Sequence, residues 1–191
     1  MISKFIEYAN EIFPSIDTNV KNGIIEYMQQ FDKKKPNWFT QNLEIISQGD
    51  ILDNVVFTKV DDEGNEIVFK SKGIVLSNTC DMTRDDYFVI APLIPYTTEF
   101  EEQTQRNIKN NIVSGKMCFT QSELEDLYVD FSMSQSMNRK VIFKLIEDEK
   151  IKRIHSLSQF GFYFLCCKIT IYYLRVENYE NFEYRNHKCF I

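Results

Sequence analysis

The sequence predicts a mainly β protein with flanking helices, an α+β fold with a small barrel at its centre. From Gly49 onward, short β-like runs alternate with turn residues, which is typical of a small barrel or sandwich. Helical spacing of apolar residues is found before this point and in one later insertion. The 191 residues, 43% of them hydrophobic, are sufficient to bury a core.

The residues before the barrel predict two helices. Apolar residues recur at helical spacing on both sides of Pro14, and Asp17 is placed to cap the second helix. Pro36 disfavours helical geometry in the residue before it, so the second helix ends there. The chain then divides into an N-terminal helical pair (1–35), a connector (36–48), the barrel domain (49–176) and a C-terminal tail (177–191).

The barrel domain contains a series of β-like runs and one inserted helix. The strands are expected near Ile51–Thr58, Ile67–Lys70, Gly73–Asn78, Tyr87–Leu93, Lys116–Thr120, Leu127–Phe131 and Lys140–Ile146. Gly64 and Asn65 tolerate the positive φ of a hairpin turn. A helix is expected over 98–112, because Thr98-Glu99-Phe100-Glu101 matches a capping box and apolar residues follow at four-residue spacing.

Charge and cysteine content limit the functions of the chain. Lys and Arg total 22 against 28 Asp and Glu, and a net charge of −6 argues against broad binding of duplex DNA. The five cysteines include no Cys-x-x-Cys pair, so we expect neither a disulfide framework nor a zinc ribbon, and no cofactor. Glu7 falls where the apolar part of a signal peptide would run, which predicts a cytoplasmic protein.

Four motifs resemble the PemK/MazF-type toxin family in order and spacing. They are Gly49-Asp50-Ile51, Gly73-Ile74-Val75-Leu76-Ser77-Asn78, Val89-Ile90-Ala91-Pro92-Leu93 and Lys152-Arg153-Ile154-His155-Ser156-Leu157-Ser158. The resemblance covers about Gly49 to Arg175 and implies an SH3-like barrel with a C-terminal helix. It also implies single-stranded RNA as ligand, endoribonuclease activity, and a place in a toxin-antitoxin or defence system.

The aromatic segment Phe160–Leu174 is ambiguous between helix and strand. Its aromatic and β-branched content and Gly161 favour a strand, whereas Ser156 or Ser158 can cap a helix, and the family resemblance points to a helix. We therefore expect a helix. The segment is shorter than the roughly 20 apolar residues of a bilayer span and is interrupted by Lys168, so we expect no contact with a membrane.

The resemblance also indicates where an RNA site would lie. In the family, an arginine before the Val-Val-Leu-Ser strand acts on the scissile phosphate and a threonine follows the Ala-Pro-Leu strand. Ser71 and Ile94 occupy these positions here, and Lys70 and Lys72 flank Ser71. A lysine balances phosphate charge but lacks the bidentate guanidinium. The predicted RNA-binding residues are Lys70, Lys72, Ser77, Asn78 and Arg84.

The polar segment that follows the strand containing Leu76 could instead hold a nucleophilic catalytic site. Cys80 is a candidate nucleophile, His155 its candidate base, and Asp81 or Asp130 the carboxylate that would orient the histidine. This set would make the protein a Cys/His hydrolase. The same residues are also explained structurally, as turn formers, a small buried thiol and a hydrogen-bonded core histidine.

Two further surface patterns have alternative explanations. Acidic residues at 61–63 and 81–86 lack an Asp-x-Asp-x-Asp-Gly loop, so a solvated face is favoured over a metal site. Lys33-Lys34-Lys35 beside Trp38 and Phe39 match single-stranded RNA contacts, although lysines also stabilise a helix C-terminus. Because Ser71 and Ile94 depart from the family, a non-catalytic module that binds a protein partner, or forms a homodimer, is the alternative function.

Overall fold

The computed structural model describes residues 37–96 and 100–174, so the predicted N-terminal helical pair and the C-terminal tail lie outside the described residues. The strands are β1 (Phe39–Thr40), β2 (Ile51–Val60), β3 (Glu66–Val75), β4 (Tyr87–Pro95), β5 (Lys116–Cys118), β6 (Leu127–Asp130), β7 (Gln135–Asn138) and β8 (Lys152–Leu157). The helices are α3 (Thr79–Arg84), α4 (Glu102–Lys109), the 3₁₀ turn η1 (Phe131–Met133), α5 (Arg139–Glu147) and α6 (Gln159–Leu174).

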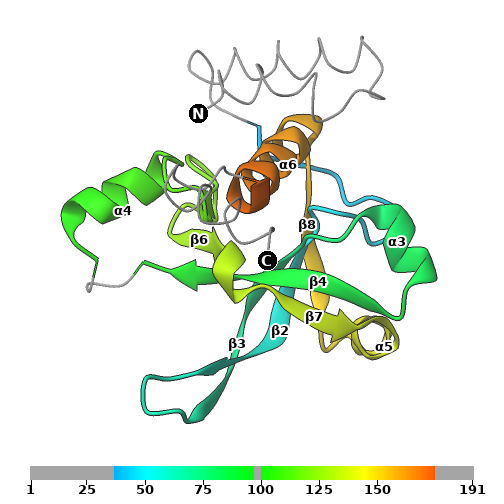
Figure 1. The fold of residues 1–191 in the computed structure, drawn as a ribbon. Coiled ribbons are helices and arrows are strands. Elements are labelled where there is room, and N and C mark those ends of the chain that lie inside the picture. The colour runs from blue at the N-terminus through cyan, green and yellow to red at the C-terminus, as the bar shows by residue number, and fades with distance from the viewer. Residues whose placement is uncertain (1–36, 97–99, 175–191) are drawn as a thin grey trace, which may run out of the picture.

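The strands form one open antiparallel sheet in the order β1-β8-β2-β3-β4-β6-β5, with β7 paired to β4. Strand β4 connects the two parts of the sheet, because its beginning pairs with β7 and its end with β6. Figure 1 shows α6 across the top of the sheet, α4 and α3 on either side, and the β2–β3 hairpin projecting below. The predicted α+β class, mainly β with helices, is therefore confirmed.

Two hydrophobic clusters form the core. The first packs α6 against the sheet and includes Trp38, Ile74, Leu93, Phe119, Val129, Phe164 and Leu165. The second lies between the sheet and α5 and includes Leu52, Val55, Phe57, Val75, Phe88, Ile90 and Ile142. Since neighbouring residues of β3 and β4 belong to different clusters, these two strands carry apolar side chains on both faces.

The β2–β3 hairpin differs from the prediction in one respect. The two strands expected at Ile67–Lys70 and Gly73–Asn78 are one strand, because β3 pairs with β2 along its length apart from a bulge at Asp53 and Asn54 of β2. The turn is as predicted. Gly64 has a φ of 85°, and the carboxylate of Asp61 accepts hydrogen bonds from the N–H groups of Glu63 and Asn65.

The strand predicted at Lys140–Ile146 is wrong, since these residues lie in helix α5. Its apolar residues Val141, Ile142, Phe143, Leu145 and Ile146 have the β-branched and aromatic content of a strand. However, Ile142, Leu145 and Ile146 contribute at helical spacing to the core, and the side chain of Asn138 caps the helix by accepting from Val141 N–H at 3.2 Å.

Helix α6 confirms the choice of helix for Phe160–Leu174, and Ser158 Oγ caps it by accepting from Gly161 N–H at 3.2 Å. The inserted helix is present but α4 is shorter than 98–112, and its N-cap Glu101 makes no capping bond with its side chain. Strands β1, β7 and β8 and helix α3 were not predicted. Of the helices within the described ranges, none has the length and apolar character needed to cross a membrane.

Candidate functional site

The two positions that the resemblance singles out lie close together. Ser71 on β3 donates a hydrogen bond from Oγ to the carbonyl oxygen of Leu93, and Ile94 follows Leu93 on β4. Ile94 in turn pairs with Tyr128 on β6. The fold therefore brings the two positions singled out by the resemblance close together. However, the Ser71 hydroxyl is already hydrogen-bonded to the backbone, and Ile94 has an aliphatic side chain.

The lysines that flank Ser71 cannot replace the family arginine. Successive residues of a strand point to opposite faces, so Lys70 and Lys72 lie on the face opposite to Ser71. Lys72 contacts Asp53 at 3.4 Å, and Lys70 is exposed opposite Val56 of β2. Both lysines therefore present their charge away from the place where Ser71 meets Leu93.

A cation, Lys116 of β5, lies over the ring of Tyr128, which is the β6 partner of Ile94. Its Nζ lies 4.7 Å from the ring centroid of Tyr128 and forms an ion pair with Asp130. Burial raises the pKa of Tyr128 to about 12, so its hydroxyl remains protonated at neutral pH. Because Asp130 neutralises Lys116, this lysine offers little free positive charge. No local motif signals Lys116, since its neighbours come from distant strands.

The predicted binding residues Ser77, Asn78 and Arg84 maintain the local fold around α3. Ser77 Oγ accepts from Val89 N–H at 2.8 Å, and Asn78 caps α3 by accepting from Cys80 N–H at 2.9 Å. Arg84 is exposed and forms an ion pair with Asp81. Seven residues of extended chain, about 23 Å at 3.3 Å per residue, separate Ser77 from Lys70. Lys70 therefore lies in the middle of β3, whereas Ser77 lies beyond the end of this strand at Val75.

The candidate hydrolase residues lie on different elements with different partners. Cys80 is exposed on α3, whereas His155 lies on β8, where its ring stacks on Phe39 with centroids 4.5 Å apart. The carboxylate that contacts His155 is Glu123, with Nε2 and Oε1 2.9 Å apart. The two aspartates expected to orient His155 instead contact Arg84 and Lys116.

Trp38 is unavailable for stacking on a nucleic-acid base. It is 1% exposed, its Nε1–H donates to the carbonyl of Thr120 at 2.8 Å, and its indole makes edge contacts with aromatic rings of the core. Phe39 is partly buried against Phe119. Residues 33–35 lie outside the described part of the chain, so the predicted lysine cluster has no structural description here.

A buried polar network that the sequence did not predict connects the chain before β2 to β8. Asp50 is fully buried and accepts from Ser156 Oγ at 2.6 Å, from Ser47 N–H at 2.9 Å and from Arg153 Nη1 at 3.1 Å. The guanidinium of Arg153 also donates to two backbone carbonyls at residues 43 and 45. Every group in this network is paired internally, so its role is to fix the fold.

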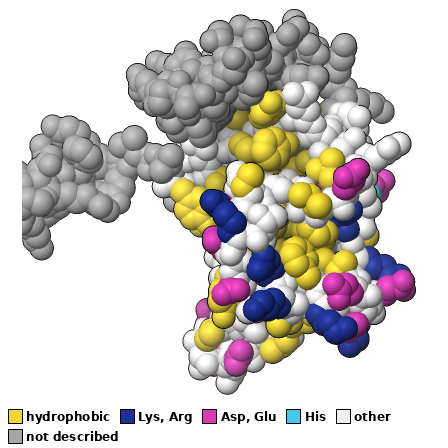
Figure 2. All heavy atoms as spheres, turned by 90° about the vertical axis from the view of Figure 1, so that its right-hand side faces the viewer, with side chains coloured by type: hydrophobic (Ala, Val, Ile, Leu, Met, Phe, Trp, Pro, Cys, Tyr) yellow, Lys and Arg dark blue, Asp and Glu magenta, His cyan; other side chains and the backbone are white. Residues whose placement is uncertain are grey.

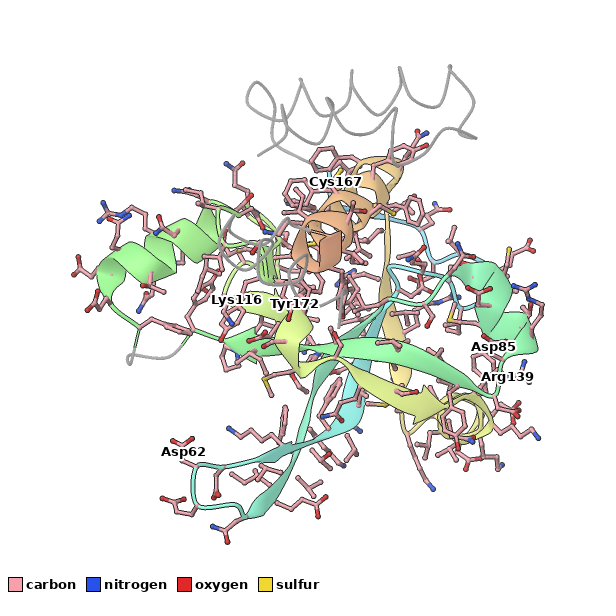
Figure 3. The ribbon with its side chains drawn as sticks, in the orientation of Figure 1. Asp62, Asp85, Lys116, Arg139, Cys167 and Tyr172 are labelled. Atoms are coloured by element: carbon pink, nitrogen blue, oxygen red, sulfur yellow. The ribbon has the colours of Figure 1, made fainter. Side chains whose placement is uncertain are left out.

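One face of the β2–β3 hairpin carries exposed apolar side chains, those of Val56, Val60 and Val68. We define the hairpin face as Val56, Thr58, Val60, Glu66, Val68 and Lys70, which are all exposed and pair as Val56 with Lys70, Thr58 with Val68, and Val60 with Glu66. The three valines are 44%, 67% and 63% exposed. Figure 3 shows the hairpin projecting away from the helices, with Asp62 at its tip.

The side chain of Gln135 bridges β7 and the otherwise open edge of β2. Its Oε1 accepts from Thr58 N–H at 3.2 Å, and its Nε2 donates to the Thr58 carbonyl. The bridge blocks the backbone groups through which another strand would add to this edge. On the side of the molecule that carries α3 and α5, hydrophobic side chains lie through the middle of the face, with basic and acidic side chains around and between them (Figure 2).

Comparisons with known proteins add no assignment. No protein-family model matches the chain, and no curated protein matches it. Within residues 37–96 and 100–174 there is no group of three or more His, Cys, Asp or Glu side chains arranged to hold a metal ion.

Proposed function

We propose that the protein is a PemK/MazF-like binding module that contacts a protein partner and does not cleave RNA by the family's route. The observation that carries this proposal is the hairpin face, where Val56, Val60 and Val68 are between 44% and 67% exposed on one side of a projecting hairpin. Contiguous apolar side chains on an exposed element mark interaction surfaces.

The chemistry at Ser71 and Ile94 supports binding over cleavage. Metal-free cleavage of RNA needs a base for the 2′-hydroxyl, a cation for the charged intermediate and an acid for the leaving oxygen. The Ser71 hydroxyl donates to the Leu93 carbonyl, Ile94 has no titratable group, and the Lys116 ammonium is paired with Asp130. None of these three residues offers a free cation to a phosphate.

The strand pairing supports the scaffold part of the proposal. Strands β8, β2, β3, β4 and β7 are consecutive neighbours in the sheet, and Gln135 of β7 reaches back to Thr58 of β2. We propose from this order that the five strands correspond to a small SH3-like barrel, with the Gln135 side chain bridging its open side. Helix α6 occupies the place in the chain of the family's C-terminal helix.

The proposal is tested by recovery of the full-length protein from its native host. We expect a stoichiometric protein partner with the wild type, and loss of that partner from a Val56→Ser/Val60→Ser/Val68→Ser variant. A Tyr87→Ser/Val141→Ser variant is the matched control, because these side chains are also 59% and 55% exposed. A partner that remains on the triple variant, or bound material that disappears after ribonuclease treatment, contradicts the proposal.

A second candidate function, contact with single-stranded RNA, is favoured by one observation. Lys70 is exposed and makes no ion pair among the described residues. The neighbouring Lys72 is held by a partly exposed pair with Asp53, whose side chains are 33% and 46% exposed. Exposed pairs contribute about 0–1 kcal/mol, so phosphate can displace the aspartate.

RNA binding is measured by the fluorescence anisotropy of a labelled single-stranded RNA, with gel analysis of the same samples for cleavage. The informative variant is Lys70→Ala/Lys72→Ala. Lys140→Ala/Lys144→Ala is its control, because it also removes one exposed lysine and one paired with an aspartate, here Asp148. A weaker signal in the first variant alone establishes RNA as the ligand, and an equal signal in both removes this candidate.

A further inference from the structure

The hairpin face has a charge pattern that matches itself. On β3, Glu66 and Lys70 each lie two residues from Val68 on the same face, one toward the tip of the hairpin and one toward its base. Acidic residues continue beyond Glu66 into the tip at 61–63, and Lys72 continues beyond Lys70 toward the base. The hairpin face is therefore acidic at Glu66, toward its tip, and basic at Lys70, toward its base, while Lys72 is paired with Asp53 of β2.

We propose that the partner of the hairpin face is a second copy of this chain, packed face to face with the two hairpins antiparallel. The proposal rests on the proposed function and names its partner. The two-fold axis lies midway between the two sheets. It runs perpendicular to the strands, at the level of the Thr58–Val68 pair. This operation places Glu66 of one copy opposite Lys70 of the other, twice, because a two-fold interface is isologous.

The apolar residues match under the same operation. Val56 of one copy meets Val60 of the other, and Val68 lies against Val68 at the axis. Two charge pairs thus flank a centre of β-branched side chains, which is the arrangement of an apolar core with a polar rim.

Association through the face is favoured over association through the β2 edge. Gln135 occupies the backbone N–H and C=O of Thr58 at the middle of the exposed part of β2, so another strand cannot pair there without displacing it. A face of six side chains is smaller than the roughly 800 Å² per partner of stable complexes. The dimer is therefore reversible and depends on protein concentration and on ionic strength.

The test is sedimentation velocity of the full chain over a range of concentrations at low salt. The wild type forms a dimer at high concentration. Lys70→Glu brings Glu66 against a glutamate at two contacts, and Glu66→Lys brings Lys70 against a lysine at two contacts, so each variant dissociates with a constant raised by about tenfold or more. Both residues are exposed, and unchanged thermal melting verifies that each variant is folded.

The decisive sample is an equimolar mixture of the two variants. In the mixture every like-charged contact becomes an opposite-charged one, so dimerisation returns to the level of the wild type, as it does in the Glu66→Lys/Lys70→Glu double variant. Lys140→Glu, a charge reversal at an exposed position of α5, leaves the wild-type dimer unchanged.

Two results overturn the inference: a wild type that stays monomeric at the highest concentration, and a mixture that associates no better than either variant alone. These results are distinct from a failure of the proposed function. If the wild type stays monomeric but retains a valine-dependent partner from the host, the second copy is excluded and the binding module stands.

Discussion

Lys168 on α6 gives the most quantitative prediction. Its side chain is 1% exposed, and its ammonium donates to the carbonyls of Asn111, at 3.2 Å, and Val113. No carboxylate in the described ranges pairs with it, and burial lowers the pKa of Lys168 from 10.5 to about 8. The folded protein therefore binds fewer protons than the unfolded chain between about pH 8 and pH 10.5, and its stability rises with pH in that window.

The size of the effect follows from the shift. At 1.36 kcal/mol per pKa unit, the shift destabilises the folded state by about 3 kcal/mol below pH 8. Because the penalty falls as the folded chain loses the Lys168 proton while the unfolded chain still keeps it, the free energy of unfolding gains about 1.3 kcal/mol from Lys168 between pH 7 and pH 9.

Chemical denaturation of the wild type and of Lys168→Met at pH 7, 8 and 9 measures this contribution. Methionine keeps a flexible chain of similar length but does not titrate. Burial raises the pKa of Cys118 and Cys166, so both thiols lower stability at alkaline pH, but they do so equally in the two proteins. We expect the difference between wild type and variant to move by about 1.3 kcal/mol in favour of the wild type. Parallel pH profiles would refute the reasoning.

Three other variants test particular contacts. Ser158→Ala removes the N-cap of α6 and lowers the free energy of unfolding by about 1 kcal/mol in urea denaturation, and no loss contradicts the capping role. Gly73→Ala places a Cβ 2.6 Å from Ile90 Cγ2 and 2.9 Å from Phe57 Cζ, so we expect a loss of about 1–3 kcal/mol by thermal melting, whereas an unchanged melting temperature argues against this close packing. Cys80→Ser leaves any RNA or ester cleavage unchanged in an assay matched to the wild type, and a loss of cleavage would restore the Cys/His hydrolase.

The elements that the sequence predicted correctly are those whose signals are local. The turn at Gly64 and the cap at Ser158 depend on residues within four positions of each other, so they can be recognised without knowledge of the fold. By contrast, Lys140–Ile146 has the composition of a strand and becomes α5 because Ile142 packs into the core at helical spacing. Tertiary packing overrides propensity in such a short segment.

The candidate site was harder to predict because its chemistry depends on long-range pairing. The placement of Ser71 beside Ile94 follows from motif order, whereas the direction of Lys70 and Lys72 depends on the register of β3. Similarly, the partner of His155 is Glu123, 32 positions earlier in the chain, and no motif connects the two residues.

The central claim is that the hairpin face is the surface that binds the partner. Hydrogen–deuterium exchange tests this claim most directly. The exchange of the isolated protein at low concentration is compared with that of the protein in the complex recovered from its host or at a concentration where it self-associates. The account predicts new protection concentrated at residues 55–60 and 66–70. Protection confined to residues 77–84, or unchanged exchange in the hairpin, would contradict it.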